Sequence, residues 1–221
     1  MSELSLKSAK SLYVNLGRTI RDLEIATDNI IKAVDELKDM NVANPLILNY
    51  NIASIYLNFI NLDICAAYRL YISGTTHYEQ RYAVKQLYTI MNEGYKRLYG
   101  FDNKSQDPLK KNPQKGSVWV NYLSCYAECG VSAIEEAYQS CLSVLERFND
   151  PVIYDKDARC HGAHYNEDYS ATYNFLKDLD AEKVTIGATN FFGFMDSYRK
   201  FISFIQECIA TDICLHINIK R

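Results

Sequence analysis

Residues 12–37 read "LYVNLGRTIRDLEIATDNIIKAVDEL", and this stretch decides the fold class. Its apolar positions recur at steps of three and four residues, which is the period of one face of an α-helix. The positions on that face are Leu12, Leu16, Ile20, Leu23, Thr27, Ile30, Val34 and Leu37. A half-buried strand would alternate every second residue, so the pattern predicts one long amphipathic helix over about residues 4–39.

The same period continues through most of the chain. Further helices are predicted over about residues 45–73, 78–99, 118–148, 168–179 and 181–212. No stretch has a strong strand pattern, and the tail "ICLHINIKR" fits either a helix end or a short extended piece. The sequence therefore predicts an all-α fold, in which residues 1–221 form a single helical domain built as an elaborated bundle of about five to six helices.

The period also predicts which face of each helix is buried. In the second helix the expected inward positions are Ile52, Tyr56, Phe59, Leu62, Ala66 and Leu70. In the fourth they are Trp119, Tyr122, Tyr126, Cys129, Ala133, Ala137, Cys141, Val144 and Phe148.

Composition excludes several classes of protein. The chain is 48% hydrophobic and 23% charged, so it can bury a core and is not an intrinsically disordered chain. A net charge of −3 argues against a dedicated, strongly basic nucleic-acid binder, although a local basic patch remains open. The 18 tyrosines suit helix interfaces or a self-association surface, because a tyrosine buries its ring and keeps its hydroxyl at a wet edge.

Cysteine usage and hydropathy indicate a compartment. The seven cysteines are scattered, and most lie in apolar helical patterns, where they read as small reduced core residues. The first residues have no signal-peptide core, and no window of about 18 apolar residues occurs. We therefore expect a cytoplasmic protein with no membrane span.

Residues 100–117, "GFDNKSQDPLKKNPQKGS", form the one long polar stretch. Two prolines, two glycines and the lack of a hydrophobic period predict a loop. Its four lysines leave two interpretations open: a solvated connector, or a basic arm over a substrate.

The segment "DKDARCHGAHYNED", residues 155–168, is the candidate site. On a regular helix Arg159 and His164 would be about 140° apart around the axis, so they would not share a face by backbone geometry alone. Gly162 between them suggests a helix end or a close backbone approach. His161 and His164 are three residues apart, and Asp168 is four residues after His164, so Asp168 could orient that imidazole.

An arginine, four variable residues and a histidine, followed here by Tyr165, resembles the R-x4-6-H signature of the HEPN superfamily. Those proteins are compact helical bundles, and many are metal-independent ribonucleases of toxin, antiviral and CRISPR-associated systems. The position agrees as well, since "DARCHGAHYNEDYSATYNFLKDLD" follows one long predicted helix and precedes another. One departure is Cys160, because the residue after the arginine is commonly Asn, Asp or His in the nucleases.

The resemblance implies a reaction and an assembly. RNA cleavage without a metal ion uses the ribose 2′-hydroxyl as nucleophile and needs proton transfer and a cation for the phosphorane. His164 suits the proton transfer, and Arg159 suits bidentate phosphate binding. His161 would be a second acid–base group or a phosphate contact, and Tyr165 would stack on a base or donate a hydrogen bond. The family arrangement implies a homodimer whose two motifs face each other, with RNA as substrate and an antitoxin or other protein as a further partner.

Three other interpretations stay open. Arg159 could simply pair with Asp155, with no chemistry in the segment. Cys160, His161 and His164 with Glu167 or Asp168 offer zinc-ligand types, but no C-x2-C pair accompanies them, so we expect neither a metal nor another cofactor. The chain could also be a non-catalytic helical module that binds a protein or a nucleotide through its aromatic surface.

Overall fold

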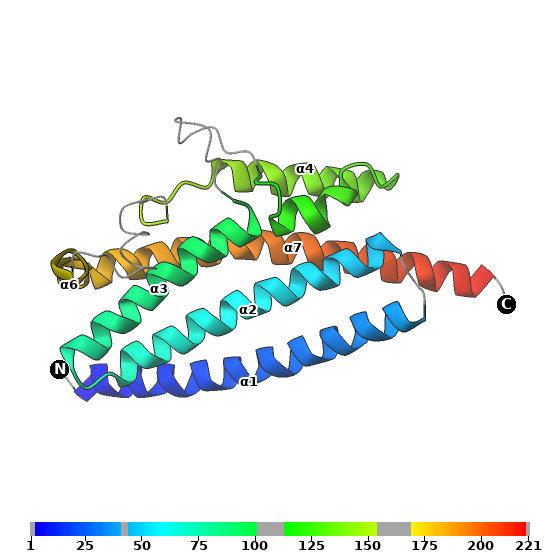
Figure 1. Ribbon diagram of the computed structural model, residues 1–221. Helices are drawn as coiled ribbons and strands as arrows, with labels where there is room; N and C mark the ends of the chain where they lie inside the picture. Colours follow the sequence, from blue (N-terminus) through cyan, green and yellow to red (C-terminus); the bar gives the residue numbers. More distant parts are fainter. Residues whose placement is uncertain (1–2, 41–43, 101–112, 154–168, 220–221) are drawn as a thin grey trace. The chain divides into compact units, whose positions relative to one another are not determined.

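The computed structural model describes residues 3–40, 44–100, 113–153 and 169–219. Figure 1 traces its elements along the chain, from α1 in blue to the red end of α7. The long helices are α1 (Glu3–Asp39), α2 (Pro45–Ser73), α3 (His77–Leu98) and α7 (Ala181–Ile219). Shorter elements are the π-helical turn η1 (Trp119–Leu123), the 3₁₀ turn η2 (Ser124–Tyr126), α4 (Ser132–Arg147) and α6 (Tyr169–Asp178).

The all-α prediction is confirmed, since the described residues are almost entirely helical and contain no strand. The predicted bounds of the first three helices agree with the structure to within a residue. The tail is the end of a helix, because α7 continues to Ile219.

The prediction of one helix over residues 118–148 is wrong. The chain there forms η1 and η2, turns at 127–131, and begins α4 only at Ser132. Gly130 has a φ of +80°, in the left-handed region that glycine adopts without a Cβ clash, and Val131 is extended. An α-helix does not continue through two such residues.

This break also shifts the buried face of α4. Its buried residues are Ile134, Tyr138, Cys141 and Leu145. The predicted inward positions Ala133 and Val144 are exposed, Val144 by 49%. The helix starts anew after Gly130, so a phase extrapolated from Trp119 misses three of these positions by one residue, whereas Cys141 is buried as predicted.

The predicted inward face of α2 is wrong as well. Its buried residues include Ala53, Leu57, Ile60, Ile64 and Ala67. The predicted positions Phe59, Ala66 and Leu70 are exposed. The helix is apolar on every side, with Asp63 and Arg69 as its only charged residues, so the period alone could not select the face.

The chain divides into two compact units, each made of three separate stretches. Unit 1 comprises Met1–Ala26, Asn58–Tyr95 and Asn149–Phe191, and unit 2 comprises Thr27–Leu57, Lys96–Phe148 and Phe192–Arg221. In unit 1 the helices approach closely at Gly94, where a Cβ would lie 3.1 Å from Phe191 and 3.2 Å from Ile60. The core around it includes Ile64, Val84, Leu87, Met91 and Ala188.

The core of unit 2 is aromatic and centres on Trp119, which is 1% exposed. Its indole N–H donates to the Tyr138 hydroxyl at 3.1 Å, and the two rings stack at 4.8 Å. Tyr198 meets the indole edge-on at 5.5 Å and donates its hydroxyl to the carbonyl of Leu98. These rings therefore bury apolar area while their polar atoms stay hydrogen-bonded.

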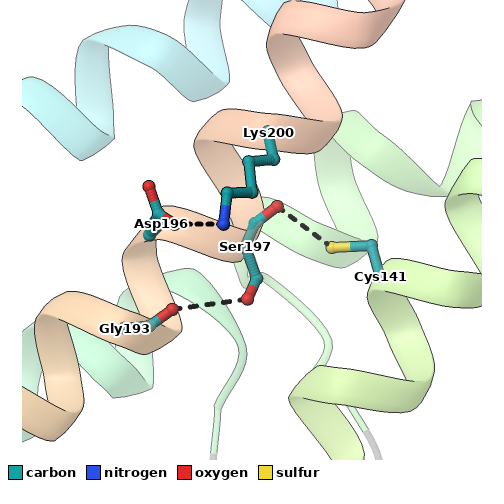
Figure 2. A network of polar contacts seen from close by, with 5 residues as sticks. All are labelled: Cys141, Gly193, Asp196, Ser197 and Lys200. Carbon is teal, nitrogen blue, oxygen red and sulfur yellow. Dashed lines mark hydrogen bonds and ion pairs between the residues drawn. The ribbon is translucent and has the colours of Figure 1, made fainter.

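In the same unit, α4 is tied to α7 through Cys141, as Figure 2 shows. The Cys141 thiol donates to the carbonyl of Ser197 at 3.5 Å, and the Ser197 hydroxyl donates to the carbonyl of Gly193 at 3.3 Å. Burial raises the pKa of Cys141 to about 12. The thiol is therefore neutral at physiological pH, which fits a structural role for this residue.

Candidate functional site

The predicted site residues lie outside the described part of the chain. These are Arg159 and His164, and the supporting His161, Tyr165 and Asp168, together with the weighed zinc ligands Cys160 and Glu167. The structure does describe the two flanks of this segment, up to Ile153 and from Tyr169 onward, and both belong to unit 1. The frame of the candidate site can therefore be built from its flanks.

The upstream flank is fastened by a buried carboxylate, Asp150, which is 2% exposed. One carboxylate oxygen accepts from the backbone N–H of Val152 at 2.9 Å, and the other accepts from the Asn190 side chain on α7 at 2.7 Å. Burying a carboxylate without hydrogen-bond donors costs free energy. These two hydrogen bonds therefore offset the cost of burying the Asp150 side chain.

A second side chain holds the last described residue before the segment. Asn92 of α3 donates its Nδ2 to the carbonyl of Ile153 at 2.7 Å, and both residues are buried. The Oδ1 atom of Asn92 is buried and has no hydrogen-bond partner among the residues that the structure describes. Ile153, two residues before the candidate segment, is thus held against α3.

The downstream flank returns to the same face of α3. Phe175 of α6 meets Tyr88 edge-on, with ring centroids 6.2 Å apart. Tyr88 and Asn92 are four residues apart on α3 and therefore lie on one side of that helix. Described residues on either side of the candidate segment thus contact one side of α3.

Two shallow clefts lie beside these flanks in unit 1. Their volumes are about 180 and 290 Å³, and Val152, Asp180 and Lys183 line both. Asp180 caps α7, since its Oδ1 accepts from the backbone N–H of Glu182 and of Lys183. Lys183 is exposed and is the one cation in the described lining of the two clefts, where carboxylates such as Asp178 and Glu182 outnumber it.

Sequence reasoning missed Asp150, Asn190, Asn92 and Lys183. In the sequence, "NDP" at 149–151 is only a helix-breaking stretch that follows the predicted helix over 118–148. The two contacts that matter link residues 40 and 61 positions apart. No local pattern carries such a signal.

Gly187 of α7 lets the upstream flank lie directly on the helix. A Cβ there would be 3.1 Å from the Cβ of Val152 and 3.3 Å from its two methyl groups. Gly193, on the same helix, has nothing within 4 Å of the same position. The pair offers a matched test of this close approach.

We predict opposite effects of alanine at these two glycines. Alanine stabilises a helix interior by about 1 kcal/mol relative to glycine, so Gly193→Ala should raise the free energy of unfolding by about 0.5–1 kcal/mol. Overpacking costs about 1–3 kcal/mol, so Gly187→Ala should lower it by about 1 kcal/mol net. Urea unfolding of both variants measures the difference, and equal stabilisation by both would show that residues 150–153 do not press on α7.

The described residues hold no group of three or more His, Cys, Asp and Glu side chains placed to bind a metal ion. Nor is there, among the helices that the structure describes, one with the length and apolarity needed to cross a membrane.

Comparison with known proteins gave no further assignment: no protein-family model, no curated protein and no solved structure matches this chain.

Proposed function

We propose that this chain is an HEPN-like helical protein that cleaves RNA without a metal ion, using Arg159 and His164. The observation that carries the proposal is how the residues on either side of the motif are held. Ile153 and Phe175, which lie on either side of the segment with the R-x4-6-H spacing, contact Asn92 and Tyr88 on one side of α3. A site that must hold a phosphate and a ribose hydroxyl in one geometry is favoured when the residues on both sides of it are held in place.

The roles follow from the side-chain chemistry. His164 takes the proton of the 2′-hydroxyl, since imidazole titrates near neutral pH. Arg159 binds the phosphate with two parallel hydrogen bonds and stabilises the charge of the phosphorane. His161 serves the leaving oxygen or the phosphate, Tyr165 stacks on a base, and Asp168 orients the imidazole of His164.

The proposal includes a homodimer, with the motifs of two chains forming one groove. It also includes a cytoplasmic location and a defence or toxin role with an antitoxin-like partner. The cysteines support a reducing compartment, because Cys141 is a buried thiol in the core rather than part of a disulfide.

A non-catalytic binding module is the second candidate, and exposed apolar side chains favour it. In unit 1 the exposed fractions are 64% for Tyr78, 61% for Tyr173 and 56% for Ile186. Large exposed rings are typical of interaction surfaces.

The test is incubation of the purified chain with a panel of RNAs in EDTA. The proposal predicts cleavage, with 2′,3′-cyclic phosphate ends on the products because the 2′-hydroxyl is the nucleophile. If the whole panel stays intact, the enzyme proposal is wrong and the binding module takes its place.

A further inference from the structure

A cation on unit 2 is fixed in place yet exposed to solvent. Arg97, in the last turn of α3, lies with its guanidinium carbon 4.4 Å from the centre of the Tyr56 ring. Its Nη2 donates to the Tyr56 hydroxyl, and its Nη1 donates to the carbonyl of Gly116 at 3.4 Å. The side chain is nevertheless exposed. Most exposed arginines sample many rotamers, whereas this one is held on an aromatic face.

A turn at residues 114–117 holds a second cation, Lys115, next in sequence to Gly116, whose carbonyl Arg97 binds. Ser117 donates its N–H to the carbonyl of Gln114 at 2.9 Å, and Gly116 has a φ of +93°. This is a tight turn that needs glycine at its third position. The turn is tied to the end of α3, because Gln114 donates its N–H to the carbonyl of Tyr99 at 2.7 Å. Lys115 therefore stands exposed at the corner of the turn, next to the carbonyl that Arg97 binds.

Tyr122 completes the group. Its ring stacks on Tyr56 at 6.1 Å, and the two side chains are hydrogen-bonded. Partial burial and the neighbouring Tyr56 raise the pKa of Tyr122, against the smaller opposing effect of Arg97. The phenol is thus neutral, and its hydroxyl is hydrogen-bonded to Tyr56 within the group. We refer to Arg97, Lys115, Tyr56 and Tyr122 as the Arg97 cluster.

No described carboxylate neutralises the Arg97 cluster. The ion pairs recorded between described residues, such as those of Lys38 with Asp35 and of Lys200 with Asp196, do not involve Arg97 or Lys115. A guanidinium has five N–H donors, and Arg97 uses two of them on Tyr56 and Gly116. The remaining guanidinium donors and the ammonium of Lys115 are available to an anion. An arginine that is already oriented loses little side-chain entropy when it binds one.

We propose that the Arg97 cluster is a binding surface for single-stranded RNA, with Arg97 and Lys115 on phosphates and a base stacked on the guanidinium or on Tyr122. Cations interleaved with aromatic rings bind single strands in this manner. A simple anion would use the cations but not the rings, and the rings are what favour a nucleotide strand. The identity of the ligand as RNA rests on the proposed function, whereas the binding surface itself is independent of Arg159 and His164.

The test is fluorescence anisotropy of a labelled single-stranded 2′-O-methyl oligonucleotide with the full chain in EDTA. This probe cannot be cleaved through a 2′-hydroxyl, so binding is measured apart from catalysis. Arg97→Gln and Lys115→Gln should each raise the Kd about three- to tenfold and lower the slope of log K against log salt by about 0.7. Lys10→Gln and Arg18→Gln, which remove exposed cations of α1, are the matched controls and should leave the Kd within about twofold.

Tyr56→Phe distinguishes the effect of the orientation of Arg97 on binding from the effect of its charge alone. It keeps the ring and removes the hydroxyl that receives the Arg97 hydrogen bond, so the Kd should rise with no change in net charge. If the wild type does not bind the probe, or if Arg97→Gln and Lys115→Gln bind it as the α1 controls do, the inference is overturned.

The same preparations separate this inference from the nuclease proposal. If the chain binds the probe through Arg97 but leaves RNA intact, the binding surface is supported and the nuclease proposal is contradicted. If the chain cleaves RNA but Arg97→Gln binds the probe as the wild type does, the nuclease proposal is supported and this binding surface is contradicted.

Discussion

Alanine at Arg159 or at His164 is expected to lower the rate of RNA cleavage by about a hundred- to ten-thousand-fold. A positioned general base contributes that much to a proton transfer, and an arginine on a developing phosphorane contributes a similar amount. Because the two groups act on one transition state, the double variant should be little worse than either single variant. The measurement is the single-turnover rate on one RNA in EDTA.

His77→Ala is the control for this comparison, because His77 is an exposed histidine at the start of α3. It should cleave at the wild-type rate. Each variant must first match the wild type in helical circular dichroism and in mass in solution. Variants at Arg159 and His164 that are folded and fully active would show that cleavage occurs elsewhere or comes from a contaminant.

The largest expected loss of stability comes from Trp119→Ala, at about 3–5 kcal/mol. The change would open a cavity among Tyr138, Tyr198 and Phe201, which all contact the indole. It would also remove the donor that the Tyr138 hydroxyl accepts from. Urea unfolding monitored by circular dichroism gives the free energy of unfolding. The control is Val144→Ala at an exposed position of α4, which should change that free energy by less than about 0.5 kcal/mol.

Tyr138→Phe resolves the two parts of that loss. It keeps the stacked ring but leaves the buried indole N–H without its acceptor, which costs about 1–3 kcal/mol. A Trp119→Ala loss no greater than that of Tyr138→Phe would mean that the aromatic packing around the indole contributes little to unit 2.

The fold class and most helix bounds could be predicted because they depend on local signals. The buried residues of α3 include Val84, Leu87, Met91 and Tyr95, as its period indicates. The face of α2 could not be predicted, since a helix that is apolar all round has no phase to read. The break before α4 depends on the φ of Gly130, which the surrounding period concealed.

The candidate site divides in the same way. The spacing of Arg159 and His164 is a local pattern, so the sequence gives it directly, and it stays a prediction. The frame around it depends on Asp150 and Asn92, whose partners are far along the chain. Contacts of that kind arise from packing and have no signature in a short stretch of sequence.

The most direct measurement is cleavage of one RNA in EDTA, beside the same sequence carrying 2′-O-methyl groups. A metal-independent nuclease that uses the ribose hydroxyl as nucleophile cuts the first oligonucleotide and leaves the second intact, and this is the result we predict. Cleavage of both would contradict the assigned mechanism, and cleavage of neither would contradict the assigned function.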